Sequence, residues 1–410
     1  MRILFLAHRV PYPPNKGEKI RAFHELQFLA ARHSIDLFCF ADSHDEAVEA
    51  QALEKLCRRC YVEPLNRVGR LLGAARSLWS NQPLSAGYFF SSKMREEVRR
   101  ALKTESYDLI FVYCSSMAQY VPQPAPAPVV IDFVDTDSAK WSQYASATSF
   151  PLSWIYAREA HSLAGYEKQL MRASAASVVA TPQEATELDV DGGFPVEVIS
   201  NGVCLPPDNA GTLPDEIRRL QPYVLFVGTM DYLPNADAVS YFAKDILPLV
   251  RKRHPELRFV IAGRNPSRPV RRLGRLANVA VIGAVPEVYS YIRGATAVVA
   301  PFRICQGVQN KILEALAAEQ PVVATSRPAR AIGARHGETL LVADTAEEFA
   351  SAVLAILEDP SVRAKLRGTQ EFVKRRFDWQ RNLGQLERLF DRLANLPRIE
   401  EGVADRAAAR

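Results

Sequence analysis

One run of the chain, residues 301–325 (PFRICQGVQNKILEALAAEQPVVAT), constrains the fold more than any other. Short β-branched stretches lie at 298–300 and 322–324, as expected of strands that are buried on both faces. Between residues 309 and 318, apolar side chains recur at the spacing of one helix face. The run therefore predicts a strand, a glycine turn, a helix and a second strand, which is half of a nucleotide-binding site.

Three polar positions of this run suit a nucleotide. Gly307 comes just before the helix, where the missing side chain lets a phosphate approach free amide groups at the positive end of the helix dipole. Asn310 and Glu314 lie four residues apart on another face of the helix, and Glu314 could accept hydrogen bonds from ribose hydroxyls. On spacing alone, an ordinary buried helix with a solvated Glu314 remains the alternative.

The same run resembles the donor-site signature of retaining glycosyltransferases of family 4, which have two Rossmann-like domains facing across a cleft (the GT-B fold). In that family two glutamates eight positions apart flank a glycine turn, and the second begins Glu-Ala-Leu/Met-Ala. This chain keeps Gly307 and the sequence of 314–317, but Gln306 stands in place of the first acid. Gln306 can hydrogen-bond sugar hydroxyls through its amide, although it carries no charge.

The length of 410 residues exceeds what one core usually holds, so we expect two domains. With the resemblance, the α/β pattern predicts a Rossmann-like acceptor domain at 1–205, a linker at 206–221 and a Rossmann-like donor domain at 222–376. In the family, the last helix typically crosses back onto the first domain, which implies the same for 377–395. Residues 396–410 have few large apolar side chains and are predicted to be a frayed tail.

In the first half, two loops are candidates for ligand contact. Gly17 follows the strand predicted at 2–7 and starts a helix, at the sheet edge where open α/β folds bind ligands. It could contact a phosphate or the acceptor, or be a simple turn glycine. Asp132, Asp135 and Asp137 follow another strand and could suit Mg²⁺ or Ca²⁺. The resemblance implies that no metal is required, that this loop faces the cleft and that Asp135 contacts the transferred sugar or the acceptor hydroxyl, although no histidine accompanies these aspartates in the sequence.

In the second half, four predicted strands each end near a glycine or a turn, which lines one sheet edge with backbone amides. Gly228 ends the first of them. The chain has no G-x-G-x-x-G run, which argues against a dinucleotide-dependent dehydrogenase. Family members usually carry an Arg and a Lys after the glycine that corresponds to Gly228, but this chain has GTMDYLPN. The charge of a leaving diphosphate must then be balanced by other cations, for which the candidates are Arg264, Arg303 and Lys311.

The segment 65–103 carries eight Lys and Arg against two Glu, a net charge of +6 where the whole chain has +5. Its apolar residues alternate with arginines, which is typical of helices that dock on anionic membranes, although a solvated helix face would look the same. No stacking platform or motif for nucleic acid accompanies the charge. Without a membrane-spanning run or a signal peptide, we expect a cytoplasmic protein that can bind peripherally to the inner face of the membrane.

Along nearly the whole chain, motifs such as PYPPNKGEKIR, DFVDTDSAKW and QGVQNKILEALA resemble sugar transferases associated with exosortase-linked exopolysaccharide gene sets. The resemblance implies a retaining glycosyltransferase that moves a sugar from a nucleotide-diphosphate sugar to a glycan or lipid-linked acceptor, without a cofactor. Two alternatives stay open: a sugar-nucleotide epimerase on the same fold, and an inactive scaffold that binds a nucleotide or a lipid. The implied catalytic residues are Asp135, Arg264 and Lys311, and the implied donor-binding residues are Gly17, Gly228, Arg303, Gln306, Gly307, Val308, Asn310 and Glu314.

Overall fold

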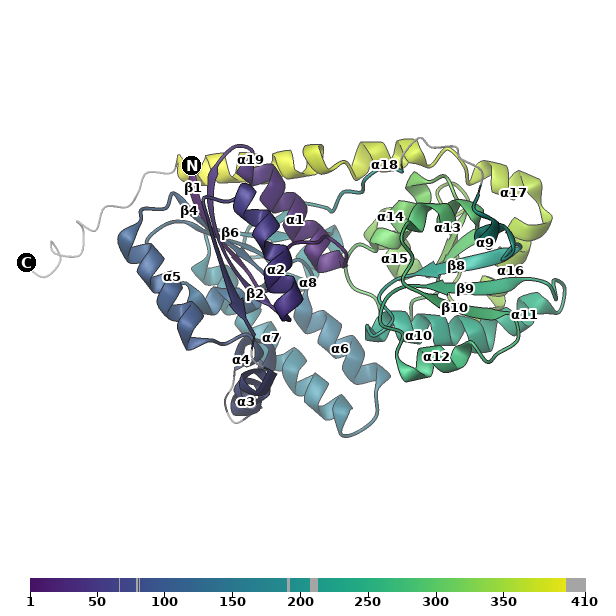
Figure 1. Ribbon diagram of the computed structural model, residues 1–410, viewed down its shortest axis with the longest axis horizontal. Helices are drawn as coiled ribbons and strands as arrows, with labels where there is room; N and C mark the ends of the chain where they lie inside the picture. The colour runs from purple at the N-terminus through teal and green to yellow at the C-terminus, as the bar shows by residue number, and fades with distance from the viewer. Residues whose placement is uncertain (66, 79, 81, 190–191, 207–212, 396–410) are drawn as a thin grey trace, which may run out of the picture.

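A computed structural model describes residues 1–65, 67–78, 80, 82–189, 192–206 and 213–395. The predicted tail at 396–410 and part of the predicted linker lie outside these residues. The described chain forms two domains side by side, each with a twisted parallel sheet covered by helices (Figure 1). None of the described helices is long and apolar enough to cross a membrane.

The first domain is built on a seven-stranded parallel sheet of order β3-β2-β1-β4-β5-β6-β7. Its strands are β1 (Arg2–Ala7), β2 (Ser34–Ala41), β3 (Arg59–Pro64), β4 (Leu109–Tyr113), β5 (Val129–Asp132), β6 (Ala176–Val179) and β7 (Val196–Val198). Its helices are α1 (Gly17–Ala30), α2 (His44–Glu49), η1 (Ala50–Lys55), α3 (Arg67–Leu78), α4 (Leu84–Tyr88), α5 (Ser92–Thr104), η2 (Ser115–Tyr120), α6 (Asp137–Ala147), α7 (Leu152–Ala173) and α8 (Pro182–Leu188).

The second domain is built on a six-stranded parallel sheet of order β10-β9-β8-β11-β12-β13. Its strands are β8 (Tyr223–Val227), β9 (Arg258–Ala262), β10 (Val279–Gly283), β11 (Ala297–Ala300), β12 (Val322–Ala324) and β13 (Leu341–Val342). Its helices are α9 (Asp215–Arg218), α10 (Leu233–Tyr241), η3 (Phe242–Ile246), α11 (Leu247–Arg251), α12 (Arg268–Leu273), α13 (Val288–Gly294), α14 (Asn310–Ala317), α15 (Ser326–Ala331), α16 (Ala346–Glu358), α17 (Pro360–Lys365) and α18 (Gln370–Arg376).

Both sheets are buried on two faces, as the near-continuous apolar strands require. Along β1, Ile3 and Phe5 point into one core while Leu4 and Leu6 point into the other, because successive side chains of a strand face opposite ways. A parallel sheet sandwiched in this way brings the carboxyl ends of its strands to one edge, where loops are free to bind a ligand.

The last helix, α19 (Trp379–Ala394), leaves the second domain and runs along the first (Figure 1). Its buried face, which includes Leu386 and Phe390, belongs to the core of the first domain that also contains residues of α1. Trp379 stacks on His24 with ring centroids 4.4 Å apart, and a side chain on Gly202 would overlap its indole. α19 therefore connects the second domain to the core of the first.

Candidate functional site

The glycine turn after β11 meets the first domain directly. Gly307 has a φ of +67°, in the left-handed region that favours glycine. A Cβ at this position would overlap the Asp135 carboxylate, which follows β5, and would lie 3.4 Å from Oε1 of Glu184 in α8. Two residues predicted from distant parts of the sequence, Gly307 and Asp135, are thus brought together across the two domains.

Of the two carboxyl groups beside this turn, that of Glu184 is buried and that of Asp135 is partly buried. Burial raises the pKa of Asp135, and burial together with the nearby Asp135 raises the pKa of Glu184. Oε2 of Glu184 accepts a hydrogen bond from Thr181 Oγ1 at 2.9 Å, whereas Oε1 has no partner among the described residues. A carboxyl group that stays protonated in such a place can donate a hydrogen bond to a ligand oxygen. Glu184 was not identified from the sequence, because only the packing of α8 against the turn shows its position.

Gln306 bridges the two domains. Its Nε2 donates to Oε2 of Glu187 in α8 at 2.7 Å. Its Oε1 accepts from Gln143 of α6 at 3.0 Å and from Arg327 of α15 at 2.7 Å. Both lone pairs of the amide oxygen are therefore occupied. The backbone N–H of Cys305 also donates to Gln143 at 2.9 Å, so this segment is fixed at two successive residues.

Asn310 also reaches the first domain. Its Oδ1 accepts a hydrogen bond from Nδ2 of Asn201 at 3.2 Å, and Oδ1 of Asn201 accepts one from the buried Arg21 at 2.9 Å. Arg21 in turn binds Oδ2 of Asp132 through Nε at 3.0 Å and Nη2 at 2.6 Å. A continuous polar chain therefore connects α14 to β5.

The aspartates after β5 have cationic partners. Arg21 holds Asp132, and Lys140 forms an ion pair with Asp137. Among the described residues, no group of three or more His, Cys, Asp or Glu side chains is arranged to hold a metal ion. His8, at the end of β1, lies close enough to Asp137 and Lys140 for their charges to act on its pKa, which burial lowers to about 4. The sequence did not reveal this histidine beside the aspartates, because β1 and β5 are far apart along the chain.

Glu314 lies on the second turn of α14, where it is partly buried. Burial raises its pKa, and no hydrogen bond or ion pair engages its carboxylate among the described residues. Its charge acts on Tyr289 and on the Cys204 thiol, and the Tyr289 hydroxyl donates to the Cys204 carbonyl at 2.5 Å. A carboxylate without such a partner on this helix face can accept hydrogen bonds from a ligand, and the ribose contact stays a prediction.

Lys311 lies beneath the end of β8. Its Nζ donates to Oδ1 of Asn235 at 2.6 Å, and it lies 4.4 Å from the ring centroid of Phe226 and 4.7 Å from that of Phe302. A Cβ on Gly228 would be 3.0 Å from this nitrogen, so a side chain at this position would crowd the lysine. Burial lowers the pKa of Lys311 to about 7, and the nearby Cys305 and Glu314, which act in the opposite direction, do not offset this effect. This lysine can therefore gain a proton when an anion approaches.

The remaining predicted residues are placed less centrally. Arg303 donates to Asp237 of α10, with an Nε–Oδ2 distance of 3.0 Å, and lies over the ring of Tyr241, so its charge is already paired. Arg264 is exposed after β9 and forms no hydrogen bond or ion pair through its side chain within the described ranges. Gly17 starts α1 and is exposed. Val308 is partly buried against the core of the second domain.

Comparison with known proteins agrees with this geometry. The family model described as glycosyl transferases group 1 matches residues 221–359. A 44.6 kDa protein of the cps region of Klebsiella pneumoniae is 21% identical over 374 residues, which are 86% of this chain and 90% of that protein. A phosphatidyl-myo-inositol mannosyltransferase of Mycolicibacterium smegmatis is 26% identical over 311 residues, 74% of this chain and 75% of that protein.

Solved structures share the whole fold. Sucrose-phosphate synthase from Thermosynechococcus elongatus superposes with a TM-score of 0.68 at 18% identity, over 96% of this chain and 99% of that one. Anabaena HepE in complex with UDP superposes with a TM-score of 0.65 at 18% identity, over 96% of this chain and 100% of that one. These likenesses confirm the predicted GT-B fold, and the family match confirms the resemblance seen in the 301–325 run.

Proposed function

We propose that this glycosyltransferase, whose residues 221–359 belong to the glycosyl transferases group 1 family, moves a sugar from a nucleotide-diphosphate sugar to a hydroxyl of a glycan or lipid-linked acceptor with retention of configuration. One observation carries the proposal: α14 presents an acceptor without a partner, Glu314, and a buried lysine beneath a glycine, Lys311. The likeness to HepE, solved with UDP and with UDP-glucose, supports a uridine nucleotide as the first donor to test.

In this proposal the donor lies along the second domain. Glu314 accepts hydrogen bonds from the ribose hydroxyls. The diphosphate lies near Gly228, over Lys311, and near the amides of Gly307 and Val308. As the bond between the sugar and the phosphate breaks, negative charge grows on the diphosphate, and a lysine that takes up a proton there stabilises that charge.

The acceptor enters from the first domain in this proposal. Asp135 lies against the Gly307 turn, where it contacts the transferred sugar or the acceptor hydroxyl. The cavity between Glu184, Gln306 and Gly307 measures only about 10 Å³, roughly the space for one water molecule. A sugar therefore enters only when the domains separate, and their closure afterwards excludes water from the reaction.

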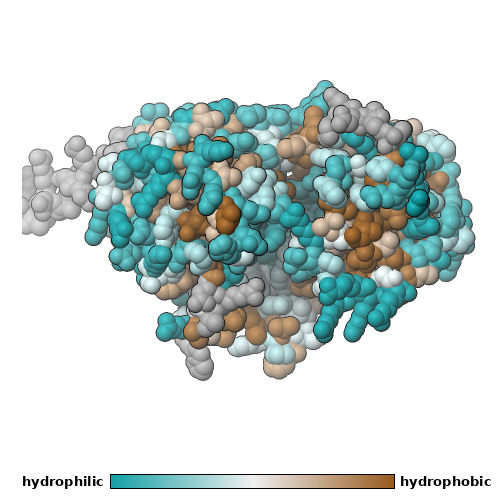
Figure 2. Space-filling model, viewed as in Figure 1, coloured by the Kyte–Doolittle hydropathy of each residue, from teal (hydrophilic) through white to brown (hydrophobic). Residues whose placement is uncertain are grey.

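The likeness to a cps-region protein and to a mannosyltransferase of a membrane lipid supports a role in exopolysaccharide synthesis at a membrane. The first domain exposes Leu71 (69%) and Leu72 (60%) on α3, Phe150 (80%) in the turn between α6 and α7, and Trp154 (59%) in the first turn of α7. Figure 2 shows apolar side chains at this lower end of the domain. These residues could insert among lipids while arginines of the 65–103 segment contact anionic headgroups.

The test begins with thermal unfolding against a panel of nucleoside diphosphates and their sugars. A ligand at 100 times its dissociation constant stabilises the folded state by about 2.7 kcal/mol. We expect one nucleotide to act selectively, Glu314→Ala to abolish its effect, and Glu347→Ala, which removes an exposed glutamate of the same domain, to leave it intact. The selected sugar nucleotide is then incubated with candidate acceptors, and NMR of the product gives the anomeric configuration.

Three results would contradict the proposal. Full donor binding by Glu314→Ala would remove the ribose contact. An inverted product would exclude retention. Conversion of the donor alone, without an acceptor, would identify an epimerase instead.

A further inference from the structure

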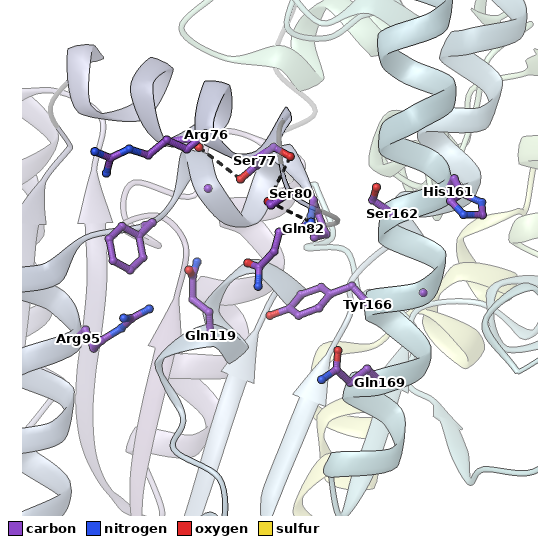
Figure 3. A pocket seen from close by; sticks show the side chains of 15 residues that line it. Arg76, Ser77, Ser80, Gln82, Arg95, Gln119, His161, Ser162, Tyr166 and Gln169 are labelled. Carbon is purple, nitrogen blue, oxygen red and sulfur yellow. Dashed lines mark hydrogen bonds between the residues drawn. The ribbon is translucent and has the colours of Figure 1, made fainter.

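A large cavity in the first domain lies outside the site between the domains. It measures about 1070 Å³ and lies between the α3–α4 hairpin on one side and α7 on the other (Figure 3). The side chains and backbone that line it belong to Gly73, Arg76, Ser77, Ser80, Gln82, Pro83, Gly87, Phe90, Arg95, Gln119, His161, Ser162, Gly165, Tyr166 and Gln169. No residue of this lining is acidic, and most can donate hydrogen bonds.

The wall formed by α3 and α4 has a fixed shape because the two helices touch through glycines. A Cβ on Gly73 would overlap the backbone of Gly87, and a Cβ on Gly87 would overlap the backbone of Gly73. Neither position therefore accepts a side chain without moving one helix. The hairpin is packed backbone to backbone, which holds its inner surface in place.

Two neighbouring residues of α7 hold this hairpin at its turn. Arg158 donates to three carbonyls at the end of α3 and just after it, including that of Gln82 at 3.2 Å. Glu159, which is fully buried, accepts from the backbone N–H groups of Leu84 at 2.6 Å and Ser85 at 3.0 Å, at the start of α4. One cation thus caps the end of α3 and one anion caps the start of α4, as the helix dipoles favour. The cavity is therefore a built chamber between fixed walls.

The charge of the chamber is positive. Arg76 is exposed and forms no ion pair within the described residues, and Arg95 lies 4.5 Å from the ring centroid of Phe90. In Figure 3 these two arginines lie on one side, while Tyr166 points from α7 toward Gln119. Among the described residues neither guanidinium is held in an ion pair, so both can bind a phosphate, which arginine does through paired hydrogen bonds.

An apolar surface continues from the charged chamber. Leu72 and Arg76 are four residues apart and share one face of α3, and Leu71, Leu72 and Leu78 are exposed on the same helix. Phe90 lines the chamber and is itself exposed. A ligand that carries both a phosphate and an apolar chain would satisfy both surfaces, whereas a free phosphate would use only the charges.

We propose that this chamber binds the phosphate-bearing head of a lipid phosphate, with the apolar chain leaving over Phe90 and the leucines of α3. One residue lies between the chamber wall and the candidate site. Tyr166 lies near Cys114, at the end of β4, and Cys114 lies near Asp137. The inference deepens the proposed function, on which it rests for the role of this lipid phosphate as the anchor of the lipid-linked acceptor; binding itself does not depend on that role.

Calorimetric titration of the whole chain with geranyl phosphate tests the proposal, with inorganic phosphate and geraniol as the separate halves of the probe. We expect geranyl phosphate to bind about tenfold or more tightly than either half. Arg76→Gln, Arg95→Gln and Gly165→Leu should each weaken binding by about tenfold. Arg99→Gln, which removes the same charge from α5 outside the chamber, should have little effect.

Gly165→Leu guards against a folding artefact. A Cβ at Gly165 meets no atom within 4 Å, so a side chain here starts from open space, and glycine is about 1 kcal/mol less favourable than alanine within a helix. Nucleotide stabilisation is measured on every variant and should be unchanged, which separates this inference from the donor site. Equal weakening by Arg99→Gln, unchanged binding by Gly165→Leu, or equal affinity for inorganic phosphate would overturn it.

Discussion

Replacing Lys311 with methionine tests whether this buried lysine is neutral in the free protein. Burial lowers its pKa from 10.5 to about 7. Since one pKa unit corresponds to about 1.4 kcal/mol, keeping the proton on Lys311 in the folded protein costs about 5 kcal/mol. That full cost applies below about pH 7. The cost decreases as the pH rises toward 10.5, because Lys311 is then already neutral in the folded protein and increasingly loses its proton in the unfolded chain too.

Between about pH 7 and pH 10.5, Lys311 binds more protons in the unfolded chain than in the folded protein, so the free energy of unfolding of the wild type should rise with pH. We expect it to gain about 1.4 kcal/mol per pH unit relative to Lys311→Met. Methionine keeps a similar apolar length against the rings of Phe226 and Phe302. It also leaves Oδ1 of Asn235 without the lysine donor, a loss of about 1–3 kcal/mol that does not vary with pH. The slope of the free energy of unfolding against pH therefore shows whether Lys311 is neutral in the folded protein.

The measurement is urea unfolding followed by circular dichroism in nucleotide-free buffer, repeated across this pH range. Lys244→Met is the matched control, because Lys244 is exposed in the same domain and its removal should leave the pH dependence of the wild type unchanged. Identical pH dependence for the wild type and Lys311→Met would mean that Lys311 keeps its proton in the folded state. Our account of its burial would then be refuted.

Two further substitutions test the contact between the domains. Gly307→Ala places a Cβ against Asp135 at a backbone φ of +67°, which costs about 1 kcal/mol or more from the backbone alone. We therefore expect a larger radius of gyration in X-ray scattering and slower sugar transfer. An unchanged radius would contradict this account of the contact between the domains. Gln306→Glu replaces a donor to Glu187 with a second carboxylate; we expect the repulsion to separate the domains and enlarge the radius of gyration, and an unchanged radius would argue against it.

The local part of the site could be predicted from the sequence because it depends on neighbours in the chain. The 301–325 run does form β11, a turn at positive φ, α14 and β12. Gly307 and Glu314 occupy the predicted turn and helix face, since their placement follows from helical periodicity and from the conformational freedom of glycine.

The partners of these residues could not be predicted, because they come from packing between distant segments. Gln306 and Glu187 are 119 residues apart, and Lys311 and Asn235 are 76 apart. Arg303 was a reasonable candidate for the diphosphate by sequence, yet its charge is paired with Asp237 in the structure. Nothing in the spacing of single residues indicates which carboxylate an arginine will meet.

Both departures from the family pattern have a physical explanation in the neighbouring residues. Gln306 stands in place of the first acid of the signature and donates a hydrogen bond to Glu187. A glutamate at position 306 would instead bring two carboxylates together, with Arg327 to balance their charge. The resemblance implies cations after Gly228, which this chain lacks, but Nζ of Lys311, from α14, lies 3.0 Å from where a Cβ on Gly228 would stand. That lysine is buried against aromatic rings and the neutral Asn235, and the effect of burial outweighs the nearby Glu314, so a bound anion favours its protonated form. The second domain can thus supply positive charge where a diphosphate would lie without holding a permanent cation there.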